Sequence, residues 1–156
     1  MKSYGVTDRT VWVADSFAGL PEPDADKYEA DKGDRHHTVD ALAVSRAQVE
    51  NNFCVYGLLD EQVKFLVGWF KDTLPVALID QVAVLRLDGD MYENTMNAIK
   101  ALYQKVTPGG YVIVDDYHTV EGCRKAVHDY LNEYAKDETV DIQEIDGTGV
   151  FWQRKI

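Results

Sequence analysis

The stretch VAVLRLDGD, residues 82–90, is an apolar, β-branched run that breaks abruptly into acids. A second stretch, GGYVIVDDY at residues 109–117, repeats this pattern. Continuous apolar runs of this kind are typical of strands buried on both faces, as in the parallel sheets of α/β proteins. Ligands of such sheets bind just outside the carboxyl ends of the strands. The two strands therefore predict four carboxylates at one functional edge, namely Asp88, Asp90, Asp115 and Asp116.

The crowding of these four acids predicts a divalent-cation site. Neighbouring carboxylates repel each other unless a cation lies between them, and Mg²⁺ and Ca²⁺ prefer oxygen ligands. If strand geometry continues through Gly89, Asp88 and Asp90 face the same side, so one can bind a metal while the other stays free as a base. Asp115 and Asp116 diverge unless the chain turns between them. Each acid alone could be a helix cap or a solvated charge, but two acid pairs at two strand ends favour a metal site.

Length and charge exclude several classes of protein. The 156 residues suit one domain with a substantial core, and the net charge of −11 argues against nucleic-acid binding, which relies on clustered Lys and Arg. Cys54 and Cys123 lie far apart, which favours free thiols in a reducing compartment. No apolar stretch approaches the ~20 residues that span a bilayer, and the N-terminus has no apolar signal core. We therefore expect a cytoplasmic protein whose partners include neither a membrane nor nucleic acid.

Strand-like and helix-like segments alternate along the chain, which is typical of βαβ units in a mostly parallel sheet. Strands are expected at residues 11–14, 63–67, 82–88 and 111–114, with a closing antiparallel hairpin at residues 140–152. Helices are expected at residues 39–53, 92–105 and 121–134, with a short helix or turn at residues 71–78. Residues 19–37 are dense in Pro, Asp, Lys and Gly and predict a long loop, which in a compact domain is usually functional or disordered.

Two further strand ends bear candidate cofactor contacts. Asp15 closes the first strand, where an acid in a nucleotide-binding α/β fold accepts hydrogen bonds from ribose hydroxyls, although Asp is also a common turn residue. Gly68, Trp69 and Phe70 place aromatic surface at the end of another strand, where an adenine ring could stack; packing in the core is the alternative. The pair His36-His37 lies in the long polar loop, and we expect no metal ligation there.

Four segments carry a family resemblance: VWVADSFAGLP (residues 11–21), VGWFKDTLP (67–75), LRLDGDMYENT (85–95) and GGYVIVDDY (109–117). In this order they closely resemble the macrocin O-methyltransferase family, and the similarity extends over nearly all of residues 11–154. Members of that family are S-adenosylmethionine- and Mg²⁺-dependent enzymes that methylate sugar hydroxyls in antibiotic biosynthesis. The resemblance implies a Rossmann-like class I methyltransferase fold, with a mostly parallel sheet and a C-terminal antiparallel hairpin.

The resemblance also implies a role for each candidate residue. Asp15, with Ser16 beside it, would hold the ribose of S-adenosylmethionine, and Gly68, Trp69 and Phe70 would lie near its adenine. Asp88, Asp115 and Asp116 match the family carboxylates that bind magnesium. Asp88 or Asp90 would be the general base that deprotonates a sugar or glycoside substrate. The loop at residues 19–37 would be the active-site lid.

One expected motif does not precede the first strand. A complete nucleotide-binding fold opens with a strand and a Gly-rich turn, and residues 1–10 contain neither. We therefore expect residues 1–156 to form a single methyltransferase domain that lacks its N-terminal part and first strand. An unpaired sheet edge at that place would favour association, and so a homo-oligomer.

Three other functions are compatible with parts of this pattern. A truncated, non-catalytic remnant could still bind metal or a partner. A catechol-type O-methyltransferase would use the same metal chemistry on a different diol. A Mg²⁺-dependent phosphoryl-transfer or receiver-type domain also clusters acids at strand ends, but it needs a phosphate-binding Lys or Thr after a later strand, and no apolar strand here ends in one.

Overall fold

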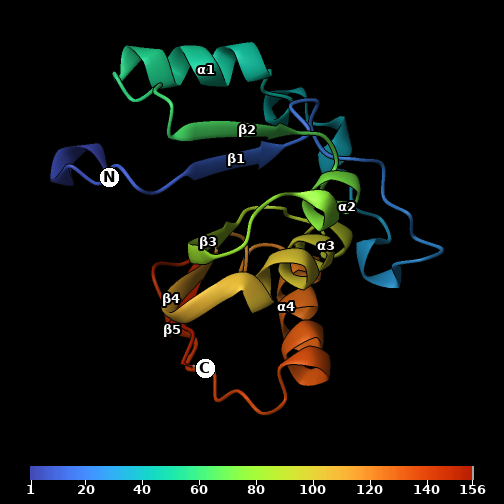
Figure 1. Ribbon diagram of the computed structural model, residues 1–156. Coiled ribbons are helices and arrows are strands. Elements are labelled where there is room, and N and C mark those ends of the chain that lie inside the picture. Colours follow the sequence, from blue (N-terminus) through green and yellow to red (C-terminus); the bar gives the residue numbers. More distant parts are fainter. Residues whose placement is uncertain (156) are drawn as a thin grey trace.

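The computed structural model describes residues 1–155, and these alternate strands and helices as the hydrophobic pattern predicts (Figure 1). The strands are β1 (Val11–Asp15), β2 (Val63–Val67), β3 (Val82–Leu87), β4 (Val106–Val114), β5 (Gln143–Glu144) and β6 (Val150–Gln153). The α-helices are α1 (Arg46–Val55), α2 (Phe70–Thr73), α3 (Tyr92–Leu102) and α4 (Glu121–Tyr134). Six 3₁₀ turns complete the order: η1 (Lys2–Tyr4), η2 (Glu29–Asp31), η3 (His36–Thr38), η4 (Asp40–Leu42), η5 (Leu74–Val76) and η6 (Tyr103–Lys105).

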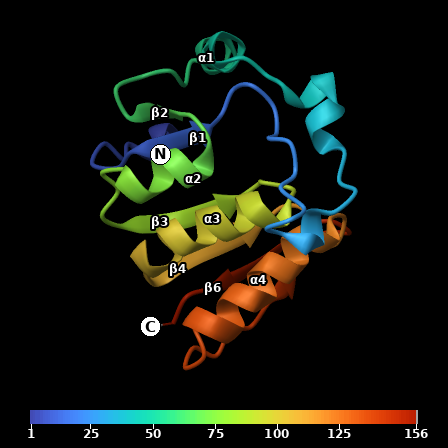
Figure 2. The ribbon, with the colours of Figure 1, turned by 90° about the vertical axis from the view of Figure 1, so that its right-hand side faces the viewer.

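The strands form two ladders. β1 and β2 pair in parallel, and a second sheet has the order β3-β4-β6-β5, in which β3 and β4 are parallel while β6 runs antiparallel to both of its neighbours. The predicted α/β class with its C-terminal hairpin is confirmed. The mostly parallel arrangement is also confirmed, but it is interrupted: the β1-β2 pair stands apart from β3 in Figures 1 and 2, and within residues 1–155 no ladder joins β1 to β3. The β1-β2 pair packs on the core through side chains instead, among them Ala14 and Leu66.

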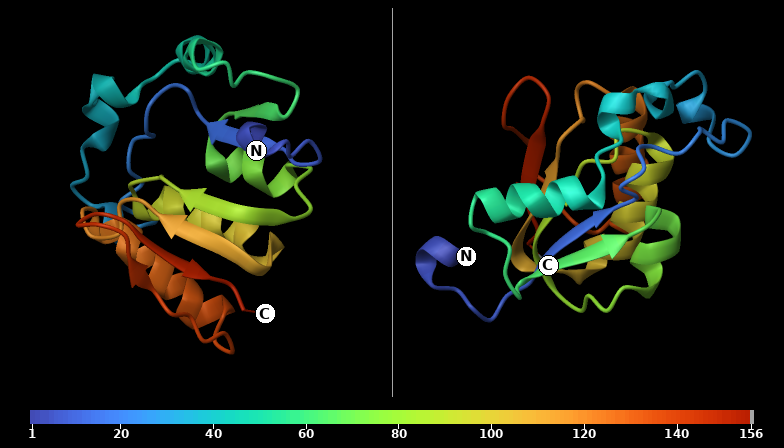
Figure 3. Two further views of the ribbon diagram at one scale, coloured as in Figure 1. Left: turned by 90° about the vertical axis from the view of Figure 1, so that its left-hand side faces the viewer. Right: turned by 90° about the horizontal axis from the view of Figure 1, so that it is seen from above.

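Helices α3 and α4 cover one face of the larger sheet (Figure 2). The core lies between them and the strands, and its largest fully buried side chains include Trp152, Tyr103 and Tyr130. The other face of the sheet is turned toward the viewer in the left view of Figure 3 and exposes Val84 and Tyr111. None of the helices within residues 1–155 has the length and apolar character to cross a membrane.

Helix α1 begins later than predicted. The pattern suggested a helix over residues 39–53, but α1 starts at Arg46 because Ser45 is its N-cap and accepts a hydrogen bond from the backbone N–H of Gln48 at 3.3 Å. Residues 39–44 contain only the 3₁₀ turn η4. The helix has no buried residue and rests on β2 through the edge-to-face pair of Phe53 and Phe65.

Strand β4 begins earlier than predicted. It starts at Val106 and runs through Pro108-Gly109-Gly110, whereas the pattern predicted a strand only from residue 111. The register with β3 shifts there, because Val82 pairs with Val106 while Val84 pairs with Tyr111. Gly110 makes this irregularity possible, since a Cβ at that position would lie 2.9 Å from the carbonyl oxygen of Ala83.

Candidate active site

A single pocket collects most of the predicted site residues at the carboxyl ends of β1, β2 and β3. Six of the predicted residues line it: Asp15, Ser16, Trp69, Phe70, Asp88 and Asp90. The rest of the lining comes from Gly89 and Asn94 and from both ends of the segment between β1 and α1, through Gly19, Leu20, Pro21 and Leu42. The pocket therefore bridges the two ladders, and its lining combines acidic and aromatic side chains.

The end of β1 is held by a network of local hydrogen bonds. Asp15 Oδ1 accepts from the backbone N–H of Phe17 at 2.5 Å, and Ser16 Oγ donates to the carbonyl of Gly19 at 2.6 Å. Phe17 has a left-handed backbone with φ of 55°, which this turn requires. Asp15 therefore acts as a turn residue through one carboxylate oxygen, and it lines the pocket at the same time.

The end of β2 turns sharply at Gly68. Its φ of 137° is suited to glycine, and a Cβ there would lie 2.7 Å from Thr73 Cγ2. The N–H of Gly68 donates to the carbonyl of Asp15 at 2.9 Å, which fixes the two strand ends to each other. Gly68 is not among the lining residues, whereas Trp69 and Phe70 are, so the glycine sets the backbone that presents the aromatic pair.

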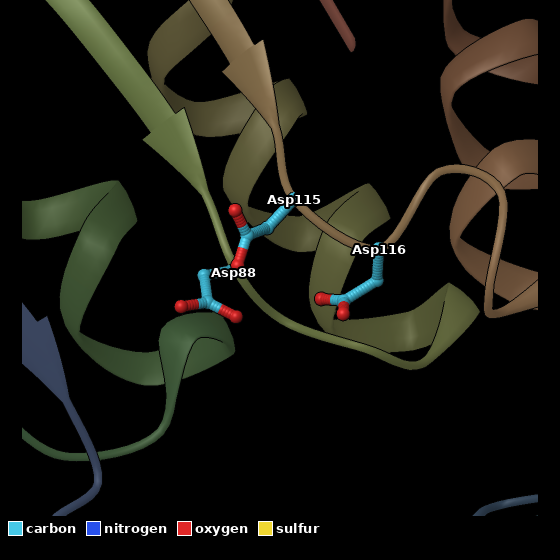
Figure 4. Close-up of side chains that lie close together, drawn as sticks. All are labelled: Asp88, Asp115 and Asp116. Carbon is cyan, nitrogen blue, oxygen red and sulfur yellow. The ribbon is translucent and has the colours of Figure 1, made fainter. Parts of the chain in front are cut away.

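Three acids converge where β3 and β4 end (Figure 4). Asp88, Asp115 and Asp116 each offer one carboxylate oxygen, and these oxygens all lie within 4.8 Å of one another. Asp116 Oδ2 is buried and has no hydrogen-bond partner among residues 1–155. Burial, followed by the negative charges of Asp90 and Asp88, raises the pKa of Asp116 to about 6. This set of oxygens is a donor set that a hard divalent cation prefers.

Asp90 lies outside this group of three oxygens. Strand geometry does not continue through Gly89 as supposed from the sequence, because β3 ends at Leu87 and Asp90 has a φ of 54°. A tight turn, in which the N–H of Met91 donates to the carbonyl of Gly89 at 2.6 Å, presents Asp90 to the pocket. Burial raises the pKa of Asp90, against the opposing effect of a positive charge on His36.

Arg86 is a site residue that the sequence reasoning missed. Its Nη1 donates to Asp88 Oδ2 at 2.8 Å, and its Nη2 donates to Asp115 Oδ2 at 2.7 Å. One guanidinium thus bridges the ends of β3 and β4. A signal was available, because Arg86 and Asp88 are two residues apart, and side chains at that spacing share a face of a strand.

The segment at residues 19–43, which includes the predicted lid, is anchored at its centre by Asp31. This side chain is only 2% exposed. Its two oxygens accept hydrogen bonds from the backbone N–H groups of Tyr92 at 2.7 Å and Glu93 at 2.9 Å, so Asp31 caps α3 from about 60 residues away in the chain. Further along, Asp34 Oδ2 lies 2.6 Å from His36 Nδ1. The sequence offered no signal for the Asp31 cap, because its partners are distant in the chain.

Comparison with known proteins extends this picture. The family model described as macrocin-O-methyltransferase (TylF) matches residues 1–154. The chain belongs to this family. The resemblance read from the sequence is therefore confirmed.

Two curated family members are similar over almost the whole chain. A tetracenomycin 4'-O-methyltransferase of Streptomyces olivaceus, which is named for a dimethoxy-rhamnosyl substrate, is 53% identical over 98% of the chain. Demethyldecarbamoylnovobiocin O-methyltransferase of Streptomyces niveus is 52% identical over 99% of the chain. In each case the chain spans 58% of the relative's own length.

A solved family structure has the same fold. The O-methyltransferase NovP matches with a TM-score of 0.94 and 51% identity, over 99% of this chain and 64% of that one. The class I S-adenosylmethionine-dependent methyltransferase fold predicted from the sequence is thus confirmed.

Replacing Asp31 with alanine is expected to lower the free energy of unfolding by about 2 kcal/mol, because a buried cap that serves two orphan N–H groups is lost. Urea denaturation followed by circular dichroism measures this change. Limited proteolysis should also cleave residues 19–43 faster, since the central anchor of the segment is gone. Asp26→Ala, at an exposed position in the same segment, is the matched control. Equal stability of the two variants would contradict the anchoring role.

Proposed function

We propose that this chain forms the cofactor- and metal-binding part of an S-adenosylmethionine- and Mg²⁺-dependent sugar O-methyltransferase. The observation that carries the proposal is the meeting of three carboxylates, Asp88, Asp115 and Asp116, beside a pocket that Asp15 and Trp69 also line. Such a reaction needs a polar contact for the ribose, an aromatic surface for the adenine and a cluster of oxygen ligands for the metal. All three would lie here at adjacent strand ends.

Residues at the ends of β1 and β2 would bind the cofactor. The second oxygen of Asp15 is available for ribose hydroxyls, while Oδ1 holds the turn at Phe17. Trp69 and Phe70 would pack against the adenine, with Gly68 shaping the turn before them. S-adenosylmethionine supplies an electrophilic methyl group when it is bound. The lining from Leu20, Pro21 and Leu42 supports the view that the segment at residues 19–43 excludes water from this pocket.

The three converging acids would hold the metal. The unpartnered, buried oxygen of Asp116 fits this role, because a buried carboxylate oxygen without a hydrogen-bond donor is costly unless a cation satisfies it. Bound Mg²⁺ supplies Lewis-acid chemistry by lowering the pKa of a coordinated hydroxyl.

Asp90 is the better of the two candidate bases. Asp88 belongs to the three converging carboxylates that would hold the metal, whereas Asp90 does not, so the carboxylate of Asp90 would be free to accept the proton of the sugar hydroxyl. Its raised pKa brings it closer to the working pH, which favours a general base. Its left-handed backbone holds the carboxylate at the pocket wall, and such unusual backbone conformations are common at active sites.

The acceptor would be a sugar hydroxyl of a glycosylated natural product. The names of the two curated relatives point this way, since one specifies a rhamnosyl-tetracenomycin and the other a novobiocin precursor.

Isothermal titration of S-adenosylhomocysteine into the chain, with and without Mg²⁺, tests the proposal. We expect saturable binding, and transfer of radioactive methyl from S-adenosylmethionine to demethyldecarbamoylnovobiocin when Mg²⁺ is present. Catechol serves as the contrasting acceptor: transfer to catechol alone would identify a catechol-type enzyme. Absence of both binding and transfer would contradict the proposal and favour a non-catalytic role.

Asp15→Asn is expected to weaken S-adenosylhomocysteine binding by about 10–100-fold, because hydrogen bonds from ribose hydroxyls to a charged acceptor contribute about 1.5–3 kcal/mol. Titration calorimetry measures the dissociation constant. Asp137→Asn, at an exposed position away from the pocket, should bind like the unaltered chain. Unchanged affinity in Asp15→Asn would leave Asp15 with its turn role alone.

A further inference from the structure

We propose that Arg86 is the resident counter-cation of the metal-free acid cluster, and that a divalent cation must displace its guanidinium from Asp88 and Asp115. This inference rests on the metal site of the proposed function. The inference adds Arg86 to the site, as a residue that opposes metal binding and also holds the carboxylates of Asp88 and Asp115 in place.

The first support is the geometry of the guanidinium. Its two terminal nitrogens donate to one oxygen of Asp88 at 2.8 Å and one oxygen of Asp115 at 2.7 Å. These two acids directly follow the neighbouring parallel strands β3 and β4, and both belong to the group of converging oxygens. Arg86 therefore engages two of the three candidate metal ligands at once.

The second support is the local balance of charge. Four acids gather at this edge, namely Asp88, Asp90, Asp115 and Asp116. Within residues 1–155, Arg86 is the sole Lys or Arg that forms a salt bridge with any of them. Asp116, in contrast, keeps a buried oxygen, Oδ2, that has no hydrogen-bond partner within the described residues. The guanidinium thus neutralises one side of the cluster and leaves the other side open to a cation.

The third support is the exposure of Arg86. Its side chain is 53% exposed, so the guanidinium can leave the carboxylates and be hydrated by the surrounding water. A guanidinium and a divalent cation on the same carboxylates repel each other, and Mg²⁺ requires closely approaching oxygens in near-ideal octahedral geometry. Because half-exposed ion pairs are weak, metal binding can break them.

Removing the guanidinium should therefore lower the stability of the metal-free chain and raise its affinity for a divalent cation. Arg86→Gln leaves the four acids without their cationic partner, so the metal-free chain becomes less stable. The same variant should bind Mg²⁺ about 3–30-fold more tightly, the range expected when two half-exposed ion pairs no longer have to be broken. By linkage, saturating Mg²⁺ should close the stability gap between the variant and the unaltered chain.

The experiment measures Mn²⁺ and Mg²⁺ affinity by electron paramagnetic resonance and calorimetry, and thermal unfolding with and without Mg²⁺. Four proteins are compared: the unaltered chain, Arg86→Gln, Arg86→Lys and Arg46→Gln. Arg46 forms a similarly exposed ion pair with Glu50 on α1 and is the matched control. Arg86→Lys keeps the charge but loses the two-pronged contact, so its metal affinity should lie between those of the unaltered chain and Arg86→Gln.

Tighter metal binding by Arg86→Gln, with a stability loss that Mg²⁺ reverses, is the expected result. If the unaltered chain binds Mg²⁺ but Arg86→Gln binds equally or less tightly, the displacement inference is wrong and the metal site stands. If neither protein binds Mn²⁺ or Mg²⁺, the metal part of the proposed function fails, and the inference fails with it.

Discussion

Asp90→Asn should lower the rate of methyl transfer by about 10²–10⁴-fold, the usual contribution of a general base. The amide has the shape of the carboxylate but cannot accept the proton of the sugar hydroxyl. Asparagine also tolerates the left-handed backbone that Asp90 adopts at φ of 54°, so the turn should persist. Single-turnover transfer of radioactive methyl from S-adenosylmethionine to the sugar acceptor measures the effect.

The binding of S-adenosylhomocysteine separates this loss from a general disturbance of the pocket. Asp90→Asn should retain the affinity of the unaltered chain, and Asp80→Asn, at an exposed position between η5 and β3, should retain both affinity and rate. A normal rate in Asp90→Asn would exclude Asp90 as the base and return the role to Asp88.

Arg154→Met should have the largest effect on stability, a loss of about 3–5 kcal/mol, because removing one partner of a buried ion pair leaves the other charge uncompensated. Arg154 is 9% exposed, and its Nη2 donates to Glu138 Oε1 at 3.1 Å. Its Nη1 donates to three backbone carbonyls around η6 and the start of β4, those of Tyr103, Gln104 and Val106. The side chain therefore ties the end of β6 to the segment after α4 and to the entry of β4.

Urea denaturation measures this loss. Lys155→Met makes a comparable change at the next, exposed residue and should alter stability little. A loss below about 1 kcal/mol in Arg154→Met, the scale of a surface pair, would show that water replaces the contacts of Arg154.

Local sequence predicted the elements whose patterns are self-contained. The apolar run of β3, the helix over residues 121–134 and the C-terminal hairpin all follow from side chains that are neighbours along the chain. The predicted element boundaries were less accurate where a helix cap or a glycine overrides the hydrophobic periodicity. Ser45 starts α1 after the predicted helix begins, and Gly110 lets β4 begin at Val106, before the predicted start at residue 111.

The candidate site likewise has features that the sequence predicted and features that it did not. The acids that follow β3 and β4 were predicted to meet because parallel strands present their carboxyl ends at one edge, and Asp88, Asp115 and Asp116 do meet there. The exclusion of Asp90 from this group depends on a left-handed turn that the sequence pattern does not reveal.

The sequence by itself determined which side chains follow each strand, and therefore the family, the α/β class and the acids at the sheet edge. Only the tertiary structure decided that Arg86 bridges Asp88 and Asp115, that Asp31 caps α3 and that β1 and β3 belong to separate ladders. The physical reason is the separation along the chain over which each kind of interaction acts. Hydrophobic periodicity reports on residues within a few positions, whereas these features depend on hydrogen bonds made, or not made, between segments that only folding brings together.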